Sequence, residues 1–151
     1  LMSQADPIRV FVSHVWEPSD DYLRVFEFLE SARNFFYKNT ATPEHLPAGD
    51  KEALREDLRG QIRAAEVAIL LPSLYAKHQD LITFQALFAQ ASSKPVVLLK
   101  YFGADAPLPK ALSDLANVVV DWDERALVDA IRQQARHEDT ARWDVIEFKL
   151  D

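Results

Sequence analysis

The residues of this chain that are best placed to do chemistry follow its first strongly apolar run. That run ends at Ser13, and His14 and Trp16 come directly after it. A serine and a histidine are the parts of a nucleophile–base pair. However, neighbouring residues on an extended chain point to opposite sides, so these two cannot form the hydrogen bond that this mechanism requires. We therefore expect Ser13 and His14 to line a binding pocket beside Trp16, which acts as an aromatic plate or else packs on the sheet edge.

Other kinds of catalytic or metal site find little support in the residue types. There are no cysteines, so thiolate zinc sites and cysteine nucleophiles are excluded. The four histidines (His14, His45, His78 and His137) have no metal-ligand spacing, and we expect no metal site. No G-x-S-x-G, G-x-G-x-x-G or P-loop motif is present, and three glycines in total are too few for a phosphate-cradling loop.

The charge and hydropathy of the chain exclude further classes. The formal net charge is −7, and the 17 basic residues are spread along the chain, which disfavours nucleic acid as a partner. No apolar run approaches the roughly 20 residues that a membrane span needs. The start of the chain shows no secretory signal, and Leu1 before Met2 reads as an added residue. These features predict a cytoplasmic protein without a membrane partner.

Short apolar runs alternate with segments of helical period. The runs are bounded by polar or turn residues, and most are continuously apolar, as in strands buried on both faces of a parallel sheet. They are Ile8–Ser13, Val67–Leu71, Pro95–Tyr101 and Asn117–Val120, with Phe35–Lys38 as a weaker fifth. The sequence therefore predicts an α/β fold with a mostly parallel five-stranded sheet.

Four helices are predicted between and after these strands. The first follows an N-cap at Ser19, and the second follows Asp50 with leucines and an isoleucine at four-residue spacing. The third carries an apolar stripe of Leu81, Phe84, Phe88 and Ala91, with Leu87 also assigned to the core, and the fourth covers residues 124–136. We expect one three-layer, flavodoxin-like domain over residues 8–138, a tail at 1–7, and a tail at 139–151 packed on the domain.

Ligands of open α/β sheets bind outside the carboxyl ends of the strands. Here those ends lead into four loops: Ser13–Ser19, Asn39–Asp50, Pro72–Gln79 and Phe102–Lys110. The polar stretch at the start of the second loop is long enough to be a functional lid, although a plain surface connection accounts for it equally well.

Several of these segments resemble a known family in their order and spacing. Arg9-Val10-Phe11-Val12-Ser13-His14 resembles the first box of TIR-like domains. Asn39-Thr40-Ala41-Thr42-Pro43-Glu44-His45 resembles the Ser-Val-Pro-Glu-containing loop of bacterial TIR-like proteins, the group that includes the ThsB proteins of Thoeris antiphage defence. Val67–Ser73 and Lys94-Pro95-Val96-Val97, with Phe102-Gly103 behind them, resemble the third and fourth strands. The resemblance covers roughly residues 8 to 135.

The resemblance implies an enzyme that cleaves the nicotinamide–ribose bond of NAD, without a metal, to make an ADP-ribose-derived signal for a downstream effector. It also implies self-association through TIR-type contacts. The catalytic glutamate of the family falls on Gln85, and its tryptophan falls on Leu81. By the same resemblance, the residues that contact NAD or an ADP-ribose-type ligand would be Phe11, Ser13, His14, Trp16, Asn39, Ser73, Tyr75 and Leu81.

Gln85 departs from the family pattern in a way that changes the expected chemistry. A carboxylate stabilises the positive charge that builds on the ribose during cleavage, whereas an amide of the same shape has no charge to offer. Either a glutamate has been replaced at this position, or the domain is naturally degenerate. The sequence thus leaves open a weakened NAD-processing enzyme and a non-catalytic TIR-like binding or interaction module. A flavodoxin-like receiver is disfavoured, because the first strand ends in Ser-His and the third in Pro-Ser, where a receiver needs acidic residues. A nucleoside deoxyribosyltransferase has only fold-level support.

Overall fold

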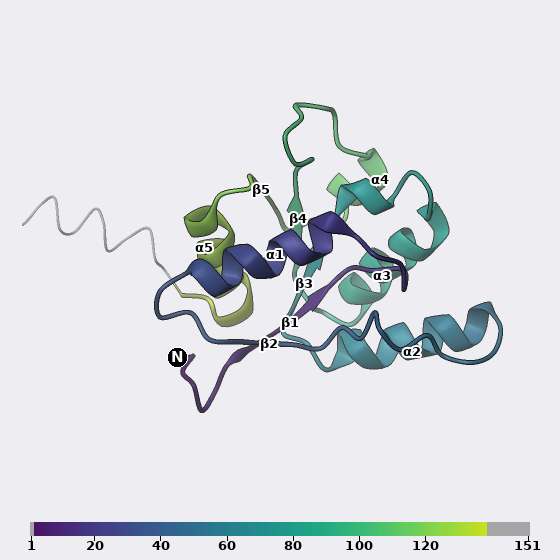
Figure 1. Cartoon of the computed structure of the whole chain (residues 1–151), viewed down its shortest axis with the longest axis horizontal. Coiled ribbons are helices and arrows are strands. Elements are labelled where there is room, and N and C mark those ends of the chain that lie inside the picture. Colours follow the sequence, from purple (N-terminus) through teal and green to yellow (C-terminus); the bar gives the residue numbers. More distant parts are fainter. Residues whose placement is uncertain (1, 139–151) are drawn as a thin grey trace, which may run out of the picture.

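The structure, a computed structural model, describes residues 2–138 and shows a five-stranded sheet in which every strand pair is parallel (Figure 1). The strand order is β2-β1-β3-β4-β5. The strands are β1 Ile8–Val12, β2 Tyr37–Asn39, β3 Val67–Leu70, β4 Val96–Leu99 and β5 Val118–Val120. The predicted α/β class and all five strands are confirmed, with every bound within two residues of that expected from the sequence.

The helices lie between the strands and after the last one, as the alternation of patterns predicted. They are α1 Asp20–Ser31, α2 Lys51–Arg63, α3 Gln79–Ala91, α4 Lys110–Ser113 and α5 Glu124–Arg136, with a 3-10 turn, η1, at Pro72–Leu74. The predicted caps are confirmed, because Ser19 Oγ accepts from Tyr22 N and Asp50 Oδ1 accepts from Glu52 N and Ala53 N. The sequence did not reveal α4 or η1, which are too short to show a helical period.

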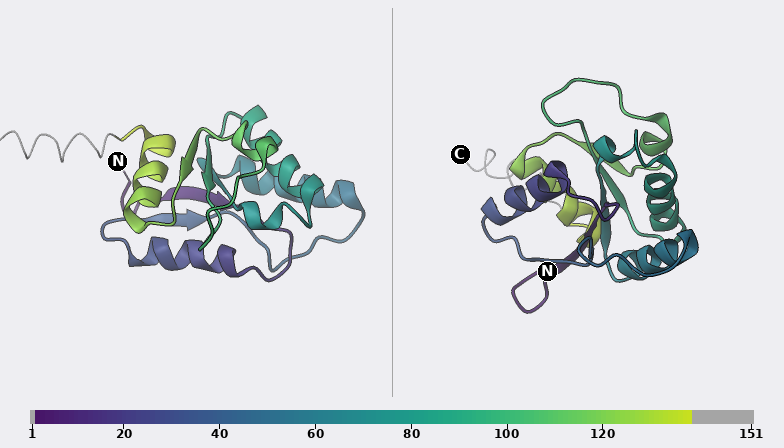
Figure 2. Two further views of the ribbon diagram at one scale, coloured as in Figure 1. Left: turned by 90° about the horizontal axis from the view of Figure 1, so that it is seen from above. Right: turned by 45° about the vertical axis from the view of Figure 1, so that its right-hand side comes forward.

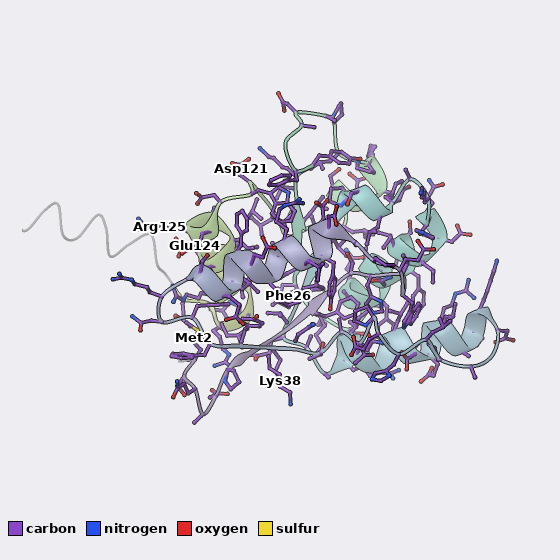
Figure 3. All side chains as sticks on the ribbon, viewed as in Figure 1. Met2, Phe26, Lys38, Asp121, Glu124 and Arg125 are labelled. Carbon is purple, nitrogen blue, oxygen red and sulfur yellow. The ribbon has the colours of Figure 1, made fainter. Side chains whose placement is uncertain are left out.

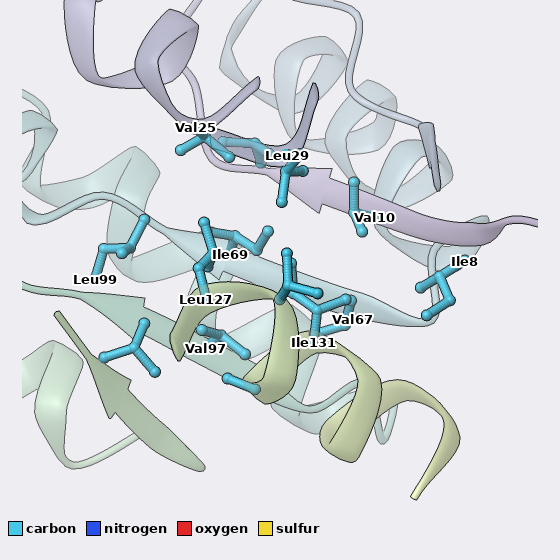
Figure 4. Close-up of a cluster of buried hydrophobic side chains, with 14 of the residues drawn as sticks. Ile8, Val10, Val25, Leu29, Val67, Ile69, Val97, Leu99, Leu127 and Ile131 are labelled. Carbon is cyan, nitrogen blue, oxygen red and sulfur yellow. The ribbon is translucent and has the colours of Figure 1, made fainter. Parts of the chain in front are cut away.

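Two layers of helices cover the sheet. The helices α1 and α5 lie on one face, and α2, α3 and α4 lie on the other (Figure 2). On the first face, Val25 and Leu29 of α1 and Leu127 and Ile131 of α5 pack over buried side chains of the strands (Figure 4). Strands β3 and β4 are fully buried along their length, which explains their continuously apolar sequences.

The face that α3 turns to the sheet differs from the predicted one. Its fully buried residues are Ile82, Gln85, Ala86 and Ala89. Phe84 and Phe88 stack on each other and are only partly buried, because they lie under the arginine side chains of α2 rather than against strands. Leu87 was assigned to the core, which is wrong: its side chain is 50% exposed. The small residues let α3 approach the sheet closely, and one glutamine is enclosed with them.

Ion pairs hold the amino-terminal side of the sheet together. The Arg136 guanidinium at the end of α5 binds both Glu66, 2.5 Å away and mostly buried, and Asp6, 3.0 Å away. Residues 2–7, predicted as a tail, are thereby tied to the domain, and the predicted tail at 139–151 lies outside the described residues.

Phe26 lies on the side of α1 that faces the sheet, whereas Lys38 points away from β2 (Figure 3). No helix within residues 2–138 is long and apolar enough to cross a membrane.

Candidate functional site

A cleft lies at the carboxyl ends of β1 and β2, beside the first turns of α1. It encloses about 550 Å³ between the loop after β1 and the loop after β2. Its lining residues are Trp16, Glu17, Pro18, Ser19, Tyr22, Leu23, Phe26, Asn39, Pro43 and Glu44. Two of the residues predicted to contact a ligand, Trp16 and Asn39, therefore meet at one site, where the fold class places ligands.

Trp16 has an unusual conformation in the wall of this cleft. Its φ is 60°, a left-handed value that is uncommon for a bulky residue. Its ring meets the His14 ring edge-on at 4.9 Å, and its indole N–H is buried without a hydrogen-bond partner among the described residues. Both features cost free energy, and costs of this kind persist where the surrounding structure enforces them.

His14 lies behind Trp16, is 1% exposed and does not itself line the cleft. Its Nε2 lies 2.8 Å from Gln61 Oε1, and its Nδ1 lies 3.4 Å from the main-chain nitrogen of Trp16. Because the carbonyl oxygen of Gln61 can only accept and the Trp16 N–H can only donate, His14 carries its proton on Nε2 and is neutral. Burial lowers the pKa of His14, against the raising effect of the Gln61 hydrogen bond and the nearby Asp57 and Glu44 charges.

Gln61 of α2 connects the two walls of the cleft. Its Oε1 also accepts from the main-chain nitrogen of Thr42, 3.2 Å away, in the loop after β2. Its main-chain oxygen accepts from Thr40 Oγ1, and its Nε2 donates to Asp57 Oδ2 at 2.6 Å. One buried glutamine therefore contacts the His14 ring on one side and, through its side chain and its main chain, Thr42 and Thr40 on the other.

Gln85, which the resemblance places at the reaction centre, is fully buried beneath the loop that follows β1. Its Nε2 donates to the main-chain oxygen of His14 at 2.8 Å, and its Oε1 accepts from the main-chain nitrogen of His14 at 3.2 Å. Both ends of the amide are thus occupied by the main chain of a single residue. Gln85 does not line the cleft; it supports the loop that forms one wall.

Ser13 and Phe11 are buried and also support the loop after β1 without lining the cleft. Ser13 is fully buried, its Oγ accepts from Leu71 N at 2.9 Å, and its own N donates to Ile69 O. It therefore joins the end of β1 to the end of β3, where the strand order reverses. Phe11 is fully buried in the core beneath α2 and α3.

The other predicted contact residues lie apart from the cleft. Ser73 Oγ donates to Asp21 Oδ2 at 2.6 Å, and the Tyr75 hydroxyl accepts from Gln79. Leu81 lines a separate small cavity of about 130 Å³ between α2 and α3. The predicted residues are therefore divided between the cleft, its support and other surfaces.

Sequence reasoning missed most of the aromatic lining of the cleft. The Tyr22 ring packs on Phe26 at 5.1 Å, and its hydroxyl accepts from Asn39 Nδ2 at 2.8 Å. Burial raises the pKa of Tyr22, whereas the Asn39 hydrogen bond acts in the opposite direction. Both aromatic residues lie on the face of α1 that also carries Val25 and Leu29, and apolar residues at helical spacing indicate core packing without a separate signal for a site.

The electrostatics of the cleft are one-sided. Glu17 and Glu44 lie on its rim, and none of its lining residues is Lys, Arg or His. Within residues 2–138, no group of three histidine or carboxylate side chains is arranged to hold a metal ion. The cleft can therefore stack a flat ring and accept hydrogen bonds from it, but it offers no side-chain cation for phosphate.

Comparisons with known proteins give information on the fold alone. No protein-family model matches the chain, and no curated protein matches it. Among solved structures, a conserved protein from Enterococcus faecalis V583 is similar, with a TM-score of 0.57 and 14% sequence identity. The match covers 84% of this chain and 98% of that protein. At this identity, the likeness shows that the two chains share an α/β architecture.

Proposed function

We propose that the chain is a non-catalytic TIR-like module that binds the ring-bearing end of an NAD- or ADP-ribose-type ligand in the Trp16–Asn39 cleft and signals through that binding. The observation that carries the proposal is the closed pair of hydrogen bonds between Gln85 and the main chain of His14. This pair turns the side chain at the family's catalytic position into a structural element.

Cleavage of an N-glycosidic bond needs a carboxylate that can face the ribose. Gln85 has no charge, and both its donor and its acceptor atoms are satisfied within the protein. A ligand that used the Gln85 amide would have to displace the main chain of His14, which would leave two buried main-chain groups unpaired. Binding without turnover fits this geometry better than catalysis does.

The lining of the cleft fits a flat heterocycle. Trp16, Tyr22 and Phe26 supply aromatic side chains to the lining, and Asn39 and Glu44 offer polar atoms that can fix the orientation of a base. Phosphate groups of such a ligand would lie outside the cleft, because the cleft has no lysine or arginine to receive them.

A second candidate is an NAD-processing enzyme of antiphage defence in which residue 85 is a glutamate. The observation that favours it is the position of Gln85, which lies directly beneath the loop that forms the cleft wall and differs from glutamate by a single group. In this case, the chain with glutamine would be a weakened form, and the product of the glutamate form would act on a downstream effector.

NAD binding and nicotinamide release, measured for the chain and for Gln85→Glu, separate the two candidates. Gln90→Glu is the matched control, because it makes the same change at an exposed position of the same helix. The proposal predicts that the parent chain binds NAD and that no variant releases nicotinamide. Release by Gln85→Glu alone would establish the enzyme instead, and lack of NAD binding by the parent chain would contradict the proposed ligand.

A further inference from the structure

The balance of charge in the cleft distinguishes it from an ordinary nucleotide site. Its rim carries two carboxylates, from Glu17 and Glu44, and its lining has no cationic side chain. A site that receives phosphate normally supplies arginine, lysine or main-chain N–H groups. This inference rests on the proposed function, since it concerns the chemistry of the same cleft.

Both carboxylates are exposed at the rim, and each has a histidine as its neighbour. Glu44 is 63% exposed, and its only ion-pair contact among the described residues is a 4.0 Å approach to the exposed His45. Glu17 is 61% exposed and lies 3.1 Å from His78 Nε2. Within residues 2–138, no lysine or arginine lies within ion-pair distance of either group, so their negative charge is not neutralised by a permanent cation.

The inner wall is aromatic, which favours the same sign of charge in a ligand. The faces of Trp16, Tyr22 and Phe26 carry the negative part of the ring quadrupole and attract a cation placed over them. The Glu44 charge also acts on the interior, since it contributes to the raised pKa of Tyr22 after the larger effect of burial. Carboxylates at the rim and aromatic side chains in the lining form a combination that can recognise organic ammonium groups.

We infer that the cleft selects a small aromatic organic cation over a neutral or anionic molecule of similar shape, with Glu17 and Glu44 setting the preference. A carboxylate or phosphate ester would meet the two rim charges without a compensating cationic side chain. The charge of the group that enters the cleft therefore determines specificity, and its aromatic shape supplies the contact area.

The test uses three probes that share a benzyl or phenyl group and differ in charge: benzyltrimethylammonium, benzyl alcohol and benzoate. Each is titrated into the full chain at pH 8, and binding is followed by tryptophan fluorescence and by NMR shifts of the Trp16 indole. We expect benzyltrimethylammonium to bind roughly tenfold more tightly than benzoate, with benzyl alcohol between them.

The two rim positions provide the matched variants. Glu44→Gln combined with Glu17→Gln should reduce the preference for the cation to about twofold, because the rings remain while the rim charge is lost. Asp105→Asn removes an exposed carboxylate from the loop after β4, does not line the cleft, and should leave the preference unchanged. Both positions are exposed, so the substitutions leave the fold intact.

The outcomes separate this inference from the proposed function. Equal binding of the cation and benzoate, binding of none of the three probes, or a preference that persists in the double variant would each overturn the inference. NAD titration in the same assay decides the proposed function independently: NAD that binds, with shifts at Trp16, supports the cleft even when the charge preference fails.

Discussion

The side-chain amide of Gln85 and the main chain of His14 form a closed pair of hydrogen bonds of 2.8 and 3.2 Å in the buried interior. The pair joins the middle of α3 to the end of β1. It satisfies the main-chain N–H and C=O of a residue that has left the sheet and has no ladder partner of its own. The side chain at this position therefore determines how the loop leaves β1, and with it the position of Trp16.

Substitution of Gln85 should destabilise the fold in a way that depends on chemistry rather than size. Gln85→Leu leaves the main-chain N–H and C=O of His14 unpaired, and we expect it to lower the free energy of unfolding by about 2–4 kcal/mol. Gln85→Glu keeps the bond to His14 N but sets a carboxylate oxygen against His14 O. Denaturant unfolding of both variants, with Gln90→Glu as the control, measures these effects.

The glutamate variant has its own pH signature. Burial without a cationic partner raises the pKa of a carboxyl above its unfolded value. Stability gained from the protonated form is then present at low pH and is lost as the pH rises, so Gln85→Glu should be less destabilised at pH 5 than at pH 8. A loss that is the same at both pH values would show that the carboxylate finds a solvated position, which contradicts the closed pair.

His14 should make the stability of the parent chain depend on pH. Its folded pKa is lowered from the ordinary 6.5 by burial, so the unfolded chain binds a proton that the folded chain resists. The stability that neutral His14 contributes is therefore complete above pH 6.5 and declines as the pH falls below that value toward the lowered folded pKa. Unfolding free energies between pH 5 and 8 should show this decline.

A histidine variant isolates the contribution. His14→Gln retains a donor toward Gln61 without a group that titrates, and it should flatten the pH dependence in this range. His45→Gln, at an exposed histidine, is the matched control. An unaltered slope in His14→Gln would mean that another group titrates.

The strands and helices were readable from the sequence because each has a strong local signal. Continuous apolar runs predicted β3 and β4, and Ser19 and Asp50 predicted the starts of α1 and α2 through their capping chemistry. The short α4 had no such signal. The error at Leu87 has a different cause, since apolar residues lie on two faces of α3 and only tertiary packing decides which face meets the sheet.

The site was less readable, because its residues come from separate loops. Trp16 and Asn39 were predicted to contact a ligand and both line the cleft, but the partners that join the walls were not predicted. Gln61 adjoins the apolar stripe of α2, and its reach to both His14 and Thr42 depends on the placement of α2 against two loops. Hydrogen bonds between residues 47 positions apart leave no local pattern in a sequence.

Loss of the Gln61 amide should loosen both walls of the cleft together. Gln61→Met has a similar volume and no hydrogen-bonding amide, so the His14 ring and the Thr42 N–H lose their shared acceptor. We expect a loss of about 2 kcal/mol in stability. Amide hydrogen exchange of residues 13–19 and 40–46 should become faster, whereas the exchange rates in α5 should stay as slow as in the parent chain. Gln90→Met is the control, and protection that falls in only one of the two loops would contradict the coupling.

Two substitutions of Trp16 should have different effects on stability and on ligand binding. Trp16→Phe keeps an aromatic ring and removes the unpaired buried N–H, so it should raise stability by about 1 kcal/mol and retain ligand binding. Trp16→Gly relieves the left-handed backbone, which costs roughly 1–2 kcal/mol for a non-glycine residue, but loses the packing of the ring, so its stability should stay within about 1 kcal/mol of the parent.

Binding should distinguish the two variants where stability does not. Trp16→Gly removes one aromatic wall of the cleft, and we expect its affinity for NAD and for benzyltrimethylammonium to fall by roughly tenfold or more. Trp16→Phe should lie within about threefold of the parent. Thermal unfolding and ligand titration on the same samples measure both quantities. If the Trp16→Gly variant binds both ligands as tightly as the parent chain, Trp16 does not contribute to the binding site. If the Trp16→Phe variant is less stable than the parent chain, the indole N–H has a hydrogen-bond partner in the folded protein.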